Sequence, residues 1–88
     1  MLYRIEFRPA AVRDLAKLDN PAREKIATKI DYLQQDPRPL GAELLQGHQK
    51  RYRLRVGVYR IIYEVKDNIL LILVIRIGHR REVYRFLR

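Results

Sequence analysis

The sequence has no cysteine and only two histidines, His48 and His79. Without cysteine, the chain has neither a disulfide framework nor thiolate chemistry. Zinc sites are commonly built from cysteine and histidine, so two histidines alone do not indicate one. We therefore expect the chain to work without a metal and without a cofactor.

Long apolar stretches are also missing. The longest unbroken one, residues 69–75, is far shorter than the roughly 20 residues that cross a bilayer. The opening residues 2–7 are too few and too charged for a secretion signal. We expect a soluble, cytoplasmic protein, and at this length a single domain over residues 1–88.

Acidic residues are the third shortage. Nineteen lysines and arginines stand against ten aspartates and glutamates, which leaves a formal net charge of +9. Such an imbalance in so short a chain indicates a polyanionic or acidic partner. Nucleic acid is the commonest partner of this kind. An acidic protein or an anionic membrane surface would also complement this positive charge.

The clearest β pattern begins at residue 51, where arginine alternates with apolar or aromatic residues. One face of the predicted strand therefore carries Arg51, Arg53 and Arg55. Gly57-Val58 has the chemistry of a two-residue hairpin loop, which places Arg55 opposite Arg60. Like charges in that position cost a sheet a few tenths to about 1 kcal/mol. A phosphate-binding surface needs this arrangement; a solvated face with splayed side chains is the alternative.

A second turn at Asp67-Asn68 precedes the apolar run 69–75. A strand that is apolar on both sides is typical of the middle of a sheet whose faces are both covered, at least in part. Two helices would cover one face, and the C-terminal segment or a partner must cover the other. Gly78 is expected to break this strand.

The N-terminal half predicts one strand and two helices. Alternation over residues 2–7 gives the strand, Pro9 suits the first turn of a helix, and Asn20-Pro21 begins a second helix that ends near Gln35. Residues 40–49 are expected to hold one helical turn. The predicted fold class is α+β. It is a small β-α-α-β-β-β domain with a largely antiparallel sheet, two N-terminal helices on one face and a short C-terminal helical turn.

Metal-free RNA cleavage needs fixed cations at the phosphate and groups that move protons. Arg60 lies in mid-hairpin on the arginine face, and Arg80 follows the expected break in the last strand. Each is either a phosphate ligand or a surface charge. His79 is either a base near neutral pH or a surface histidine. Tyr84 either packs on the sheet or acts as a base or base-stacking group. Together these residues indicate a phosphate-binding sheet.

Three stretches resemble the RelE family of toxins, within the RelE/ParE toxin–antitoxin superfamily. The family's central hairpin is similar to YRLRVGVYRIIYEV, residues 52–65. Its C-terminal signature is similar to IGHRREVYR, residues 77–85, and the stretch before its hairpin to LGAELLQG, residues 40–47. Since the order of elements also agrees, the resemblance covers nearly the whole chain.

The resemblance implies a type II toxin that enters the ribosomal A site and cuts mRNA there without a metal. The ribose 2′-OH attacks its own phosphate and leaves a 2′,3′-cyclic phosphate. Carried over by position, Arg60 and Arg80 match the family's catalytic arginines, and Tyr84 matches a tyrosine used near the 2′-OH. His79 is a candidate for the proton-transfer role.

The same resemblance implies an RNA-binding role for the neighbouring arginines. Arg51 and Arg53 fall where the family often has lysine. Arginine is effectively never deprotonated, so here they act only as fixed charges. Arg55 and Arg81 complete the predicted phosphate-binding set.

The implied partners are the ribosome with its mRNA and a cognate acidic antitoxin, through which the complex would bind operator DNA. No membrane partner is implied. Ile62, Leu73 and Ile75, beside Arg55 and Arg60, predict an apolar and basic face that an acidic, amphipathic antitoxin segment would cover.

Two alternatives stay open. The first is a ParE-like toxin that acts on DNA gyrase and lacks the RNA-cutting residues. Retention of Arg60, Arg80 and Tyr84 counts against it. The second is a non-catalytic module whose basic face only binds RNA or an antitoxin.

Overall fold

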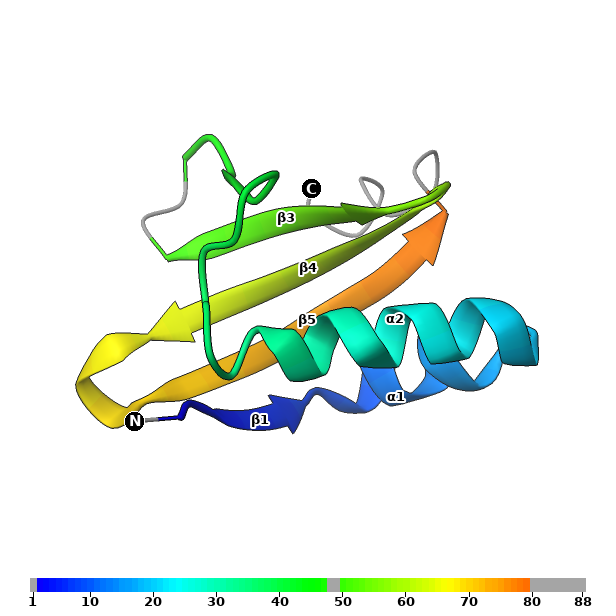
Figure 1. Cartoon of the computed structure of the whole chain (residues 1–88), viewed down its shortest axis with the longest axis horizontal. Helices are drawn as coiled ribbons and strands as arrows, with labels where there is room; N and C mark the ends of the chain where they lie inside the picture. Colours follow the sequence, from blue (N-terminus) through cyan, green and yellow to red (C-terminus); the bar gives the residue numbers. More distant parts are fainter. Residues whose placement is uncertain (1, 48–49, 80–88) are drawn as a thin grey trace.

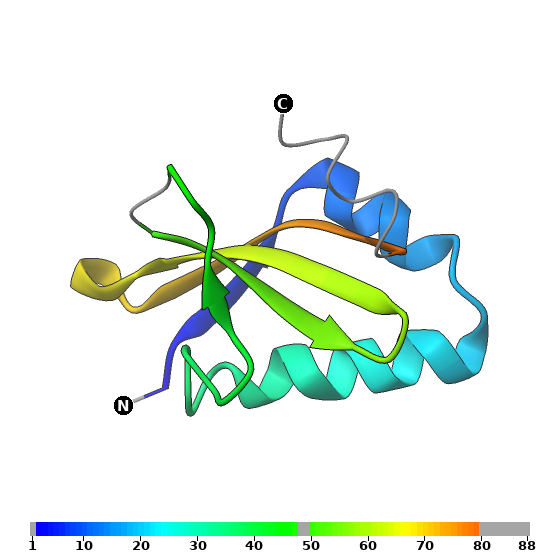
Figure 2. The same cartoon turned by 90° about the horizontal axis from the view of Figure 1, so that it is seen from above.

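The computed structural model describes residues 2–47 and 50–79. Five strands form one sheet in the order β1-β5-β4-β3-β2. Helix α2 lies across one face of the sheet, and α1 lies beside the far end of β5 (Figures 1 and 2). In chain order the elements are β1 (Arg4–Phe7), α1 (Pro9–Ala16), α2 (Asn20–Tyr32), β2 (Glu43–Leu44), β3 (Arg51–Val56), β4 (Tyr59–Lys66), a 3₁₀ turn (Asp67–Ile69) and β5 (Leu71–His79).

The predicted α+β class is confirmed. Strand β4 pairs antiparallel with β3 and β5, while β1 pairs parallel with β5 at the edge of the sheet. The predicted C-terminal helical turn lies outside the described residues. No helix in the described part of the chain is long and apolar enough to cross a membrane.

The predicted register of the β3–β4 hairpin is also confirmed. Val56 faces Tyr59 and Arg55 faces Arg60 across a two-residue turn. Gly57 has a φ of +60°, a left-handed conformation that glycine adopts at little cost. The turn therefore fixes which side chains share each face of the hairpin.

The start of β5 differs from the prediction. Residues Asp67–Ile69 form a 3₁₀ turn, and Leu70 follows with a φ of +52°. Strand β5 therefore begins at Leu71 instead of Ile69, whose side chain is 50% exposed. An unbroken apolar run has no alternation to mark its first strand residue.

The end of β5 differs too. Gly78 does not break the strand, because it pairs with Arg60, and His79 pairs with Tyr59. The strand reaches His79, the last described residue. A glycine inside a strand is tolerated where its neighbours hold the pairing, and β4 does so here.

The helical turn predicted over residues 40–49 is wrong. Glu43 and Leu44 form the short strand β2, which pairs antiparallel with the outer edge of β3. The Leu45 N–H also donates to the Arg51 carbonyl at 2.9 Å. This strand exists because β3 offers unpaired backbone groups, a tertiary cause that local propensity does not contain.

The main core lies between the helices and the sheet. Tyr52 and Tyr59 pack against it, and Tyr63 is fully buried in it. The buried members of this core are Ala11, Ile26, Ile30, Leu33, Leu54, Val56, Ile61, Tyr63, Val65, Ile72, Val74 and Ile77.

The opposite face of the sheet has a small apolar cluster of its own. Ile62 is fully buried and Ile75 is 7% exposed, and Leu45 and Leu73 pack against them. The prediction that this apolar surface lies open to an antitoxin is therefore wrong for Ile62 and Ile75. The chain after β2 supplies part of the cover through Leu45.

A polar network ties the β4–β5 turn to the N-terminus. The Asp67 carboxylate accepts hydrogen bonds from the Tyr3 hydroxyl at 2.6 Å and from the Arg38 guanidinium at 2.7 and 3.3 Å. Arg38 and Tyr3 together lower the pKa of Asp67. Arg38 also donates to the Tyr52 hydroxyl at 2.8 Å. One carboxylate thus connects the residue before β1, the loop after α2, and the turn before β5.

The observed start of β5, which leaves Ile69 outside the strand, can be tested by comparing Ile69 with the buried Ile61. We expect Ile61→Ala to lower the free energy of unfolding by about 2–5 kcal/mol, because it leaves a cavity in the main core. Ile69→Ala removes a half-exposed side chain, so we expect a loss below about 0.5 kcal/mol. Urea unfolding measures both, and equal losses would place Ile69 in the core.

The Asp67 network predicts a pH dependence with a definite sign. A carboxyl whose pKa is lowered by folding adds stability above its unfolded pKa, about 3.9. That contribution is lost as the pH falls through the folded value. Asp67→Asn should therefore melt below the wild type at neutral pH, and the gap should close in acid well below pH 4. A gap that persists unchanged in strong acid would contradict this origin.

Candidate functional site

The arginine face of the β3–β4 hairpin is the candidate site. Arg51 lies opposite Glu64 and Arg55 lies opposite Arg60. Alternation places these side chains on the face away from the main core, with Ile62 between them. The face is therefore basic with an apolar centre.

Two of the predicted phosphate ligands have carboxylate partners. Arg51 donates to Glu64 from Nε at 3.0 Å and from a terminal nitrogen at 2.5 Å. Arg53 forms an ion pair with Glu43 of β2. A phosphate must compete with these carboxylates, so Arg51 and Arg53 attract RNA less strongly than two solvated cations would.

Only one of these two carboxylate partners, Glu64, could have been predicted from the sequence. Glu64 falls opposite Arg51 in the hairpin register that the sequence predicts. That ion pair could therefore have been found from the sequence. Glu43 reaches Arg53 only because β2 pairs with β3, and no local signal predicted β2.

Arg60 is buried, with 9% of its surface exposed, whereas Arg55 is exposed. The alternative interpretation of Arg60 as a surface charge is therefore wrong. Arg60 lies on the central strand between Arg55 of β3 and Gly78 of β5. A cation held away from water acts more strongly on a nearby negative charge than a solvated cation does.

His79 lies on the other side of the sheet from Arg60. Its ring contacts Tyr59 edge-on, with centroids 6.3 Å apart and an interplanar angle of 79°. Tyr59 packs against the main core, whereas Arg60 is the next residue along β4 and faces the opposite way. His79 also lines a cavity of about 370 Å³ with Asp14, Lys17 and other residues. Its part in proton transfer stays a prediction.

The other predicted site residues, Arg80, Arg81 and Tyr84, lie outside the described residues. Arg80 directly follows His79 in the chain, and Gly78 pairs with Arg60. The segment with the C-terminal signature therefore begins at the end of β5 beside Arg60. Across residues 2–47 and 50–79, no three potential metal ligands gather in one place.

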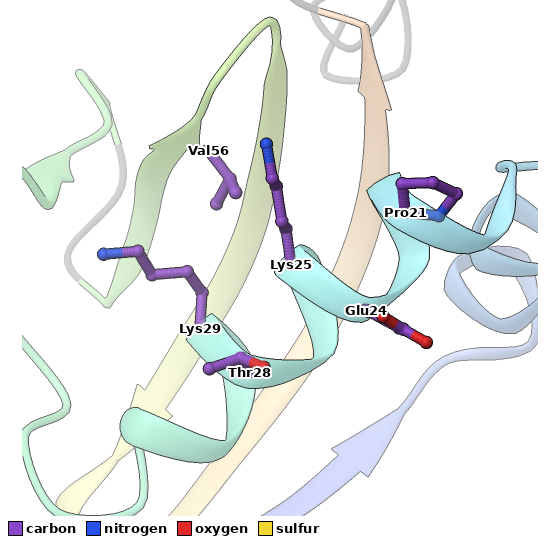
Figure 3. Close-up of a pocket in the computed structure, with 6 residues that line it drawn as sticks. All are labelled: Pro21, Glu24, Lys25, Thr28, Lys29 and Val56. Atoms are coloured by element: carbon purple, nitrogen blue, oxygen red, sulfur yellow. The ribbon is translucent and has the colours of Figure 1, made fainter.

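A larger pocket of about 530 Å³ lies between α2 and the end of β3 (Figure 3). Lys25 and Lys29, one helical turn apart, extend from α2 on either side of Val56, while Glu24 points away. None of the predicted site residues that the structure describes lines it. We therefore place the candidate site on the arginine face and not in this pocket.

A family model for the ParE toxin of the type II toxin–antitoxin system parDE matches residues 5–84. The chain belongs to the RelE/ParE superfamily of type II toxins. The predicted resemblance to RelE is confirmed by two curated relatives. Toxin RelG of Mycobacterium tuberculosis is 30% identical over 97% of this chain and 99% of its own length. The mRNA interferase toxin RelE of Escherichia coli is 33% identical over 96% of this chain and 92% of its own.

Solved structures of RelE toxins share the fold. A doubly substituted form of E. coli RelE in the free state superposes with a TM-score of 0.82, at 28% identity over 97% of this chain and 93% of that one. The RelE–RelB complex from Pyrococcus horikoshii gives a TM-score of 0.82 at 26% identity, over 93% and 99% of the two chains. The five-stranded sheet of this RelE-family toxin is thus the one seen in its relatives.

The Arg55–Arg60 pair predicts a conflict between stability and RNA binding. Arg55→Glu replaces a cross-strand pair of like charges by one of opposite charges. We expect the free energy of unfolding to rise by a few tenths to about 1 kcal/mol. We expect affinity for a short RNA to fall, because the face loses its exposed cation.

Urea unfolding and RNA titrations at several salt concentrations measure the two effects. Arg55→Gln removes the charge without reversing it, and should reduce the slope of log affinity against log salt by about 1. A stabilised Arg55→Glu variant that binds RNA as tightly as the wild type would show that RNA does not contact this face.

Proposed function

We propose that this toxin is a ribosome-dependent endoribonuclease that cleaves mRNA in the A site and so inhibits translation. The observation that carries the proposal is the pairing of Arg55 with the buried Arg60 at the centre of the hairpin. Two like charges at this position oppose folding, and a bound phosphate would remove that cost. The name mRNA interferase, given to the E. coli and Shigella flexneri relatives, supports the same reaction.

In the proposed reaction the 2′-oxygen bonds to phosphorus as the bond to the 5′-oxygen breaks. A base takes the 2′ proton, and an acid returns one to the leaving oxygen. Arg60 would hold the phosphate and its developing charge, which is usually the largest single contribution to such catalysis. Arg80 would be the second cation, and Tyr84 and His79 the candidates for proton transfer.

The remaining arginines would bind RNA without reacting. Arg55 is exposed and forms no ion pair with any residue that the structure describes. Arg51, Arg53 and Arg81 would add electrostatic attraction, the first two weakened by Glu64 and Glu43. Each step uses the chain's own side chains, so the proposal calls for no metal and no cofactor.

A cognate acidic antitoxin is the proposed regulatory partner. Solved relatives from P. horikoshii and Methanococcus jannaschii are complexes of RelE with RelB. A net charge of +9 favours capture of an acidic partner by long-range attraction. The complex would bind operator DNA through the antitoxin, and the free toxin would act on ribosomes in the cytoplasm.

A ParE-like action on DNA gyrase is the second candidate, because the matching family model is that of ParE. The arginine face counts against it. Programmed ribosomes separate the two functions: cuts confined to the A-site codon support an interferase. Inhibition of gyrase supercoiling with intact mRNA would support the alternative.

Variants at the two proposed phosphate ligands test the site. We expect Arg60→Ala and Arg80→Ala each to reduce cleavage by about a hundred- to a thousand-fold, the usual effect of losing one transition-state contact. Arg60→Lys keeps the charge but loses the fork that binds two phosphate oxygens, so it should not restore the full rate. Mapping mRNA 5′ ends measures the rates.

Because Arg60 is buried, the unfolding of each variant must be followed in parallel. Arg4→Ala removes an exposed arginine from the edge strand β1 and is the control for the loss of one positive charge. A folded Arg60→Ala or Arg80→Ala variant that cleaves like this control would remove that arginine from the site.

A further inference from the structure

Strand β5 extends beyond its outer neighbour. β1 pairs with it only from Leu71 to Val74. The Arg8 N–H donates to the Val74 carbonyl at 2.9 Å, and the chain then turns into α1. Within the part of the chain that the structure describes, residues 75–79 therefore have β4 on one side and no strand on the other.

Asp14 of α1 occupies the place of the missing strand. Its Oδ2 accepts a hydrogen bond from the backbone N–H of Ile77 at 2.9 Å. The same carboxylate accepts from Arg76, with Nε at 2.8 Å and a terminal nitrogen at 3.0 Å. The Asp14 side chain is only 10% exposed. A buried backbone donor needs a partner, and this carboxylate supplies it while the forked guanidinium balances the charge.

The position of this contact links it to the candidate site. Ile77 immediately precedes Gly78, the cross-strand partner of Arg60. The chain then passes through His79 into Arg80. Any sliding or fraying of the end of β5 would move Ile77 and Gly78 relative to Arg60.

We propose that Asp14 is a positioning residue of this toxin. By holding Arg76 and the Ile77 N–H, it fixes the end of β5 relative to Arg60, which pairs with Gly78. Asp14 contacts neither RNA nor the reacting atoms in this scheme. The inference rests on the proposed ribonuclease function.

A carboxylate of the same kind at the other end of the sheet supplies the control. Asp67 accepts three hydrogen bonds, from Tyr3 and twice from Arg38, at the turn before β5. This turn and the Asp14 contact lie at opposite ends of β5 (Figure 1). Asp14→Asn and Asp67→Asn therefore make the same chemical change in a carboxylate that accepts three hydrogen bonds, although the Asp67 side chain is 56% exposed and that of Asp14 is 10% exposed. Only the first lies next to the candidate site.

The experiment is single-turnover cleavage of mRNA on programmed ribosomes, with the toxin concentration varied at a temperature where both variants are folded. We expect Asp14→Asn to lower the maximal rate by about ten- to a hundred-fold, since small displacements of catalytic groups cost rates of this size. The half-saturating concentration should not change. Asp67→Asn should match the wild type in both quantities.

Amide hydrogen exchange supplies the second readout. Exchange at Ile77 and Gly78 should accelerate in Asp14→Asn and stay unchanged in Asp67→Asn. Arg76→Lys keeps the charge but loses the fork, so it should fall between the wild type and Asp14→Asn in rate. If Asp14→Asn does not fold, Arg76→Lys is used in its place in both measurements.

Equal losses of rate in Asp14→Asn and Asp67→Asn would reduce Asp14 to a structural residue and overturn the inference. A wild-type rate in folded Asp14→Asn would do the same. If the wild-type toxin cuts no mRNA, the proposed function itself fails. Growth arrest then compares the variants, and equal arrest by Asp14→Asn and Asp67→Asn would again overturn the role of Asp14.

Discussion

The alternation of side chains along β4 is the constraint from which the rest of the molecule follows. As the central strand, β4 sends Ile61 and Tyr63 into the core under the helices and sends Arg60 and Ile62 to the opposite face. Both faces are buried at this strand, so Arg60 is held away from water together with its apolar neighbours. The environment of the proposed phosphate ligand is thus a consequence of where the sheet places it.

The sequence predicts the β3–β4 hairpin well because the residues that determine its pairing are close together in the chain. A two-residue turn and strict alternation determine the hairpin register, and the Arg55–Arg60 pair follows from that register. The ends of β5 could not be predicted in the same way. A run that is apolar on both sides shows no alternation, so it does not reveal its first strand residue. Gly78 stays in the strand because β4 pairs with it.

The remaining differences have tertiary causes. β2 is two residues long, and pairing with β3 stabilises it. Without β2 the sequence could not reveal the Glu43 partner of Arg53. His79 faces the helix side because β5 extends further than Gly78 suggests, and that placement separates it from Arg60.

The hairpin register gives the arginine face one pair of like charges. Glu64 and Glu43 compensate Arg51 and Arg53, whereas Arg55 faces Arg60 directly. Cross-strand repulsion is therefore confined to one pair, at a cost that a small domain can carry. A phosphate that bridged the two arginines would remove the repulsion, so binding and relief of strain would act in the same direction.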